Sequence, residues 1–327
     1  MKFNEFNTNN TNQNMTAEEE RTHKNFFSNI CLSILAYIAI SEILAILVGY
    51  LSPELFKTKN NAIIISSVIQ YLIAFPIFWV VIKRIPVTLA PSKAKLSLKE
   101  LIKYLSITTF LMYIGTYISL AIMSVIEERL GIVPENAIDS LLTETDYFIS
   151  IVIVGILGPI IEEMIFRKLL IDRLFPYGEK IAILFPSLIF GLIHGNLYQF
   201  FYAFLIGMAL SYIYVKTGKA IYTIVIHCFI NLFFGVFASY AISFMDVEKL
   251  SEALESEALL MEYLQNNISA LTPYFVYIII FYALLLVGLF QFNRRIFRLQ
   301  FEKGKIVLPM INILQYFSER NAPKDEE

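Results

Sequence analysis

Eight long apolar runs, separated by shorter polar connections, dominate the pattern of the chain. They cover residues 26–51, 62–82, 101–125, 148–170, 181–194, 197–215, 220–244 and 273–292. Most are long enough to cross a hydrocarbon layer of roughly 30 Å at about 20 residues per helix. Because backbone polar groups inside a bilayer must be satisfied within their own segment, these runs predict transmembrane helices. The fifth run is short and meets the sixth at Gly195-Asn196, so the two could also form one broken hairpin.

Composition supports this interpretation. Of the 327 residues, 57% are hydrophobic and only 17% are charged, whereas a soluble domain carries about a quarter charged residues. We therefore expect an all-α, polytopic membrane bundle of about eight transmembrane helices, embedded in a lipid bilayer. The net charge of -2 provides no electrostatic footprint for nucleic acid. The two cysteines, Cys31 and Cys228, lie in apolar runs, which supports neither a disulfide framework nor a cysteine-based metal site.

The charged connections alternate in sign along the chain. The basic connections are 83–99, 167–180, 216–219 and 294–305, and the acidic connections are 127–146 and 246–262. Because cytoplasmic loops carry the excess of lysine and arginine, this alternation predicts that both termini are cytoplasmic. The first connection, with Lys57 and Lys59, departs from the alternation.

These features divide the chain into five consecutive parts. They are a polar cytoplasmic tail (1–25), three spans with their loops (26–147), a core with the candidate chemistry (148–245), an acidic outer loop (246–272), and a last span with a basic cytoplasmic tail (273–327). Within the acidic loop, apolar residues at helical spacing between 250 and 264 predict a solvated connecting helix.

The fourth run contains three ionisable residues within six positions: Glu162, Glu163 and Arg167. Such residues are costly inside a bilayer and usually have a function. Glu163 and Arg167 are four apart and can form an ion pair, whereas Glu162 points about 100° away and is free to act as a general base. Pro159 should kink the helix and free the carbonyl of Gly155. A charged helix end at the interface is the alternative, and it suits Arg167 better than the carboxylates.

Two histidine motifs follow on later runs. Phe190 and His194 are four apart and share a helical face, as do His227 and Asn231. Imidazole and amide groups could hold a water molecule or polarise a carbonyl oxygen. Taken singly, the first motif is typical of an interfacial histidine and the second of polar contacts between membrane helices.

The ordered set of motifs is more informative than any one of them. Glu-Glu-x-x-x-Arg, Phe-x-x-x-His and His-x-x-x-Asn, in this order on successive runs, resemble the CPBP family of intramembrane proteases. This family includes CAAX proteases, also called type II CAAX prenyl endopeptidases, and bacteriocin-processing or Abi-type enzymes. The resemblance covers about residues 148–237. It implies an intramembrane endopeptidase that hydrolyses a peptide bond through a glutamate-activated water.

The resemblance also assigns roles. It implies that Glu162 and His194 activate the water, that His227 and Asn231 stabilise the oxyanion, and that Glu163, Arg167 and Phe190 shape the site or bind substrate. We expect no metal to be required, because asparagine is a poor zinc ligand and no His-Glu-x-x-His motif is present. Zinc held by Glu162, His194 and His227 is the alternative.

The substrate class follows from the same resemblance. We expect a membrane-associated peptide or protein, such as a prenylated CAAX protein, a leader peptide or a regulatory peptide. The Asn-, Lys- and Ile-rich composition indicates an AT-rich microbe. It therefore favours a bacterial plasma membrane, with a role in peptide maturation or immunity and a site that opens toward the cytoplasm.

Two other classes of function remain open from sequence. A transporter could use Glu and His within the membrane as a proton relay, extended by Glu42 and Gln70. We expect Glu42 instead to make a polar contact inside the bundle. A non-catalytic immunity or scaffold protein is the second alternative.

Overall fold

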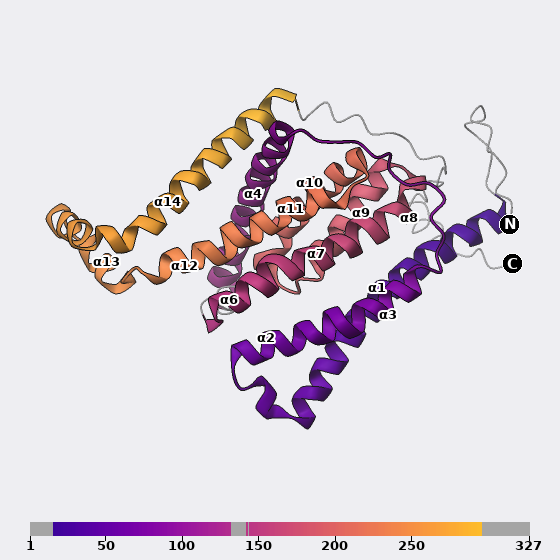
Figure 1. Ribbon diagram of the computed structural model, residues 1–327, viewed down its shortest axis with the longest axis horizontal. Helices are drawn as coiled ribbons and strands as arrows, with labels where there is room; N and C mark the ends of the chain where they lie inside the picture. Colours follow the sequence, from indigo (N-terminus) through magenta and orange to yellow (C-terminus); the bar gives the residue numbers. More distant parts are fainter. Residues whose placement is uncertain (1–15, 132–141, 143, 296–327) are drawn as a thin grey trace, which may run out of the picture.

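The computed structural model describes residues 16–131, 142 and 144–295, and all regular secondary structure in them is helical (Figure 1). The first part contains α1 (Ala17–Leu51), the 3-10 helix η1 (Pro53–Phe56), α2 (Lys59–Val68), the π-helix η2 (Ile69–Ala74), α3 (Phe75–Ile82) and α4 (Leu98–Leu130). The middle part contains α6 (Tyr147–Ser150), the π-helix η3 (Ile151–Leu157), α7 (Gly158–Glu163), the π-helix η4 (Met164–Ile171), α8 (Asp172–Leu174), the 3-10 helix η5 (Phe175–Tyr177) and α9 (Glu179–Leu192). The last part contains α10 (Leu197–Thr217), α11 (Ala220–Ile230), the π-helix η6 (Asn231–Phe237), α12 (Ala238–Ser243), α13 (Val247–Ala253) and α14 (Glu257–Arg295).

Seven helical runs in the described residues are long and apolar enough to span a membrane. They are Glu18–Leu51, Lys59–Ile82, Leu98–Leu130, Tyr147–Tyr177, Leu197–Thr217, Ala220–Ser243 and Glu257–Phe292. The eighth expected span forms α9, whose 14 residues fall short of a roughly 30 Å hydrocarbon core at about 1.5 Å each. α9 packs against α10 after a turn at Gly195, so these two helices form the hairpin given above as the alternative. The chain is an integral, multi-pass membrane protein.

Capping boxes define where two of the spans begin. At the start of α1, Thr16 accepts from the backbone of Glu19, and the Glu19 carboxylate accepts from the backbone of Thr16. Ser97 and Glu100 form the same arrangement at the start of α4. These reciprocal bonds satisfy donors that a helix start otherwise leaves free. α1 therefore begins inside the expected polar tail; residues 1–15, and the basic tail from residue 296, lie outside the described residues.

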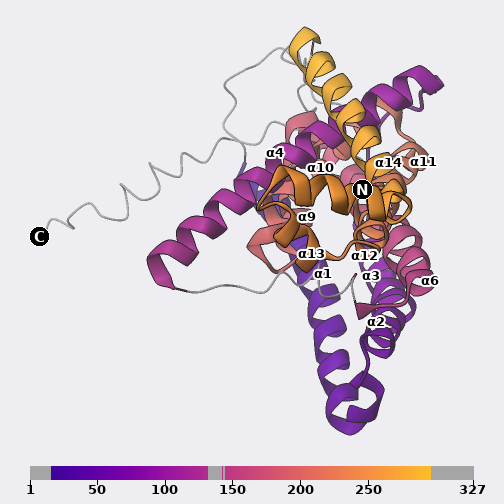
Figure 2. The ribbon, with the colours of Figure 1, turned by 90° about the vertical axis from the view of Figure 1, so that its left-hand side faces the viewer.

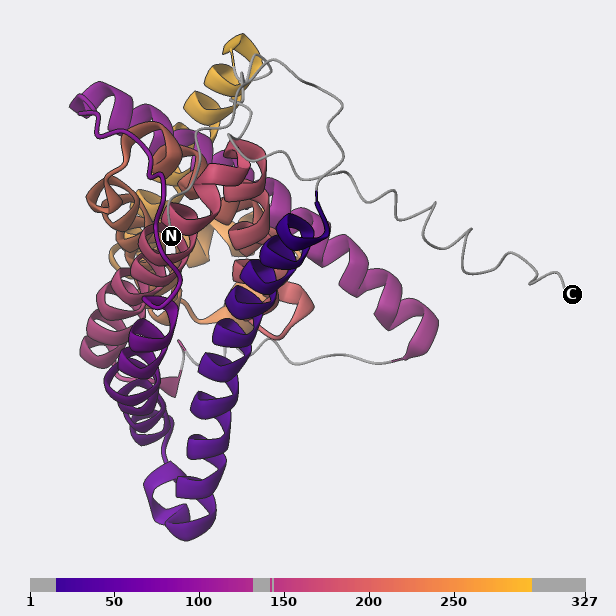
Figure 3. The same ribbon diagram turned by 90° about the vertical axis from the view of Figure 1, so that its right-hand side faces the viewer.

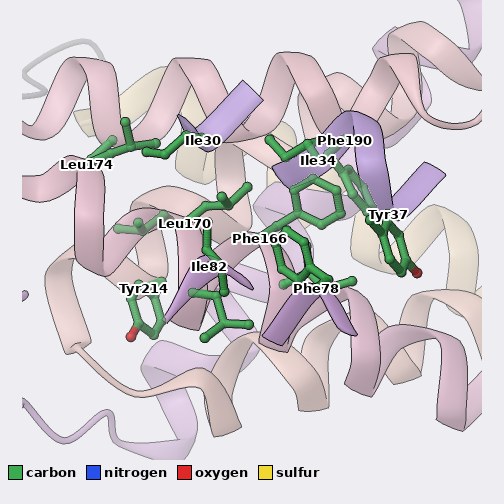
Figure 4. Packing of buried hydrophobic residues seen from close by; sticks show 14 of the residues in the cluster. Ile30, Ile34, Tyr37, Phe78, Ile82, Phe166, Leu170, Leu174, Phe190 and Tyr214 are labelled. Atoms are coloured by element: carbon green, nitrogen blue, oxygen red, sulfur yellow. The ribbon is translucent and has the colours of Figure 1, made fainter. Parts of the chain in front are cut away.

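The first two spans form an N-terminal hairpin, which comprises α1 to α3. Figures 2 and 3 show its two limbs side by side, joined at their tip near η1. Ile34 and Tyr37 of α1 and Phe78 of α3 share one hydrophobic cluster with Phe166 of η4 and Phe190 of α9. Figure 4 shows these side chains gathered in one group. The hairpin therefore packs directly on the helices that carry the first two motifs.

Glycines allow α4 to approach its neighbours closely. A Cβ built on Gly115 of α4 would lie 2.6 Å from the backbone nitrogen of Tyr202 in α10. A Cβ built on Gly288 of α14 would lie 2.8 Å from the Cβ of Phe110 in α4. Small residues at such crossings let membrane helices pack backbone to backbone.

Gly115→Ala is expected to destabilise the protein by about 1–3 kcal/mol, because the added methyl group meets backbone atoms that cannot rotate away. Thermal unfolding in detergent measures the effect. Gly49→Ala is the matched control, since its nearest neighbour is a side-chain carbon of Phe56 at 3.8 Å. An equal loss in both variants would show that the close approach of α4 and α10 is not what matters.

Residues 246–272, expected as an acidic outer loop, are largely helical. α13 and the first turns of α14 occupy them, and Ala253, Tyr263 and Leu271 form a small hydrophobic cluster. Hydrogen bonds from the side chain and backbone of Lys249 lower the pKa of Asp246, which caps α13. The helix predicted between residues 250 and 264 is thus present in two pieces. α14 then continues through Pro273, so the last long helix begins well before the expected residue 273.

Candidate active site

The helical run that carries the two carboxylates changes its hydrogen-bond pattern on both sides of them. The π-helices η3 and η4 lie directly before and after α7. In a π-helix each N–H bonds to the carbonyl five residues earlier, as Gly158 does with Ile153. Pro159 has no N–H, so the next carbonyl in this pattern, that of Val154, loses its helical partner. We expected the carbonyl of Gly155 to be freed; the difference of one residue arises because the local helix is π and not α.

Asn231 replaces the missing donor. Its Nδ2 donates to the carbonyl oxygen of Val154 at 2.9 Å. Asn231 is also the first residue of the π-helix η6, which packs against η3. The amide therefore joins two irregular helices and retains a second N–H that can serve another acceptor.

Glu163 and Arg167 form the ion pair that their spacing predicts, and both side chains are fully buried. Nε of Arg167 lies 2.9 Å from Oε2 of Glu163, although the N–H is poorly aligned for a hydrogen bond. Nη1 and Nη2 have no hydrogen-bond partner among the residues that the structure describes. The guanidinium carbon lies 5.2 Å from the ring centroid of Phe190. Charge and a cation–π contact thus hold Arg167 in place.

His227 lies between the two carboxylates. Its Nδ1 is 3.0 Å from Oε1 of Glu163, and its Nε2 is 3.6 Å from Oε2 of Glu162. Since Glu163 is paired with Arg167, its carboxylate acts as an acceptor and Nδ1 of His227 carries the hydrogen. The structure therefore joins Arg167, Glu163, His227 and Glu162 in one continuous row of charged and polar groups. Only Glu162 is substantially exposed, at 30% of its side chain.

Thr223 is a member of this cluster that the motifs did not identify. It lies on α11 four residues before His227 and is fully buried; its hydroxyl donates to the carbonyl oxygen of Ala220 at 2.9 Å and lies near Glu163. Thr223, His227 and Asn231 thus follow one helical face at intervals of four. This spacing is the sequence signal that could have found Thr223.

His194 contacts the cluster through Phe190. The ring centroids of His194 and His227 lie 5.0 Å and 5.7 Å from that of Phe190. Nδ1 of His194 lies 2.7 Å from the carbonyl oxygen of Phe190. Because a carbonyl can only accept, Nδ1 carries the hydrogen and Nε2 is available as an acceptor. In the described part of the chain, no hydrogen bond or ion pair joins His194 to Glu162, and their joint activation of a water stays a prediction.

The expectation that no metal is required stays a prediction. Among the described residues, no group of three or more His, Cys, Asp or Glu side chains could hold an ion. The alternative zinc set of Glu162, His194 and His227 is therefore not among groups arranged to hold an ion in the described residues. No step proposed below uses a metal.

Two polar residues of the first spans have different surroundings. Glu42 is exposed on the surface of α1, so the expectation that it makes a polar contact inside the bundle is wrong. Gln70 instead interacts with the hydroxyl group of Tyr37. A proton relay through Glu42 is therefore not formed by these side chains.

Fold and site together define a polytopic, all-helical membrane protein with a carboxylate–imidazole cluster inside its bundle. A family model described as "Type II CAAX prenyl endopeptidase Rce1-like" matches residues 144–233, the segment that contains all three motifs. This match confirms the resemblance to CPBP and CAAX-type membrane proteases over that segment.

A curated relative agrees with this result. The chain is 28% identical over 115 residues to "Putative membrane peptidase YdiL" of Bacillus subtilis (strain 168), which covers 35% of this chain and 44% of the relative. The chain thus matches less than half the length of that protein. No solved structure gives a significant match.

Proposed function

We propose that the chain is an intramembrane endopeptidase that hydrolyses a peptide bond in a membrane-associated peptide or protein. The observation that carries the proposal is the approach of Glu162 to Nε2 of His227, with the buried Glu163–Arg167 pair behind that imidazole. A partly exposed carboxylate beside an imidazole can take a proton from water. The matches to a CAAX prenyl endopeptidase family and to a membrane peptidase support the same class.

The proposed reaction begins when Glu162, assisted by Nε2 of His194, takes a proton from water as the water oxygen attacks the scissile carbonyl carbon. The carbonyl electrons move onto oxygen and give a tetrahedral oxyanion. When the C=O bond re-forms, the C–N bond breaks and the proton on Glu162 passes to the departing nitrogen. One water is consumed, and a carboxylate and an amine are released.

His227 and the second N–H of Asn231 are proposed to donate to the oxyanion. Donation from Nε2 of His227 requires the doubly protonated imidazolium, whose charge Glu163 and Glu162 offset. Removing a donor of this kind costs about 10²–10³ in rate in other enzymes. Arg167 and Phe190 keep Glu163 and both imidazoles in place. Substitution of either residue should therefore disturb the site.

The proposed site opens toward the cytoplasm of a bacterial cell, as the distribution of basic connections favours. The Lys95→Cys variant should not react with a membrane-impermeant maleimide in intact cells, but should react with it after lysis. Glu255→Cys, in the acidic connection before α14, should react in intact cells. The reverse pattern would place the site on the outer side.

Hydrolysis is proposed to proceed without a metal. Purified protein treated with a strong chelator should retain its rate of peptide cleavage, and metal analysis should find less than one ion per chain. Loss of activity on chelation, with recovery on addition of zinc, would overturn this part of the mechanism.

Mass spectrometry of membrane peptides tests the function as a whole. Cells with Glu162→Gln should lack cleavage products that cells with the unaltered protein contain, and these products identify the substrate. Glu42→Gln is the matched control, since it makes the same change on an exposed helix face outside the site. If Glu162→Gln preserves both the products and the biological function, a non-catalytic immunity or scaffold role is correct.

A further inference from the structure

Tyr71, which lies outside the three motifs and outside the matched segment 144–233, reaches the helix of Glu162. It belongs to the π-helix η2 in the N-terminal hairpin. A Cβ built on Gly158 would lie 3.2 Å from the hydroxyl oxygen of Tyr71. The phenol therefore packs directly over a residue that has no side chain, four positions before Glu162.

The direction of helical side chains places the Glu162 carboxylate near the same point. Side chains on a helix lean toward its N-terminus and cover the preceding turn. Glu162 and Gly158 share a face, so the carboxylate extends toward the surface on which the Tyr71 hydroxyl lies. The Glu162 carboxylate and the Tyr71 phenol also interact electrostatically. The absence of a side chain at Gly158 leaves the room for this approach.

Tyr71 also has a proton available to donate. Its oxygen interacts with the hydroxyl group of Ser67, and a phenol oxygen can accept one hydrogen bond while donating its own. Among the described residues, the charged or titratable groups near Glu162 also include Glu163, Arg167, His227 from α11 and Tyr37 from α1. Tyr37 is itself held by Gln70.

The irregular helices support a role for Tyr71. π-helices are frequent at functional sites because they redirect side chains. Each of the four π-helices in the described residues contributes a group to this cluster: η3 the Val154 carbonyl, η4 Arg167, η6 Asn231, and η2 Tyr71.

We propose that Tyr71 is a positioning residue for Glu162, and that its hydroxyl donates a hydrogen bond to the Glu162 carboxylate from the N-terminal hairpin. The role rests on the proposed function, because orienting Glu162 matters only if this carboxylate takes the proton from water. In this arrangement His227 and Tyr71 contact Glu162 from two different helices. The N-terminal hairpin is then part of the site and not only a membrane anchor.

Infrared spectroscopy of the purified protein tests the hydrogen bond without a substrate. The carboxyl band of Glu162 is identified as the one that Glu162→Gln removes. Since a hydrogen bond to a carboxylate oxygen changes the frequency of its stretching vibration, Tyr71→Phe should shift the position of this band. Tyr113→Phe is the matched control, because that hydroxyl interacts with Tyr117 on α4. An unchanged band position in Tyr71→Phe overturns the proposal.

Kinetics and stability provide independent readings. With the peptide identified from membrane extracts, Tyr71→Phe should lower kcat about tenfold and leave KM unchanged; an unchanged kcat overturns the positioning role. Gly158→Ala should lower the melting temperature, and by less in the Tyr71→Phe background, where one of the two oxygens 3.2 Å from the added methyl group is gone and only the Ile153 carbonyl oxygen remains. If Glu162→Gln still cleaves the peptide, the proposed function fails, whereas the infrared shift still reports the contact between Tyr71 and Glu162.

Discussion

Arg167→Met is expected to destabilise the protein by about 3–5 kcal/mol, the usual cost of leaving one member of a buried ion pair without its partner. Both side chains of the Glu163–Arg167 pair have no exposed surface. Without the guanidinium, the Glu163 carboxylate keeps its hydrogen bond from His227 but no cationic partner of its own among the described residues. Methionine retains much of the side-chain volume, so the loss reports charge and not a cavity. Thermal unfolding, followed by the reaction of Cys31 and Cys228 with a thiol dye, measures it.

Two variants separate the charge effect from other causes. The double variant Glu163→Gln with Arg167→Met removes both charges and keeps an acceptor for His227, so it should be more stable than Arg167→Met alone. Lys249→Met breaks an exposed ion pair with Asp246 and should leave the melting temperature almost unchanged. If the double variant is as unstable as Arg167→Met, the buried charge is not the origin of the loss.

The sequence predicts the spans and the charge pair because both depend on local spacing. Apolar runs of sufficient length define helices in a bilayer, and Glu163 and Arg167 meet because residues four apart on a helix are neighbours. The same rule correctly leaves Glu162 outside the pair. It also predicts the common face of His227 and Asn231, and it could have added Thr223.

Contacts between helices are what local spacing cannot predict. The bond from His227 to Glu163 and the bond from Asn231 to Val154 each join residues more than 60 positions apart. The π-helices moved the freed carbonyl by one residue, because a change of period depends on tertiary contacts and leaves no pattern in the sequence. Tyr71 reaches the site only through the packing of the N-terminal hairpin. Glu42 was wrongly placed because spacing alone does not say which face of a span meets lipid.

Glu162→Gln is expected to lower kcat by about 10²–10⁴ with little change in KM, the range that loss of a general base produces. Glutamine has nearly the same shape and lies at a partly exposed position, so folding should be preserved. His194→Gln should also lower kcat, since the proposal gives its Nε2 a supporting role. Melting temperatures close to that of the unaltered protein confirm that the loss is one of chemistry.

Cleavage of the identified peptide in ¹⁸O-labelled water, by purified protein in lipid bilayers, tests the central claim most directly. The claim is that Glu162 delivers a water-derived oxygen to a peptide carbonyl. The unaltered protein should release a fragment whose new carboxylate carries ¹⁸O, and Glu162→Gln should release almost none in the same time. Labelled fragment formed at an equal rate by both proteins would contradict the account.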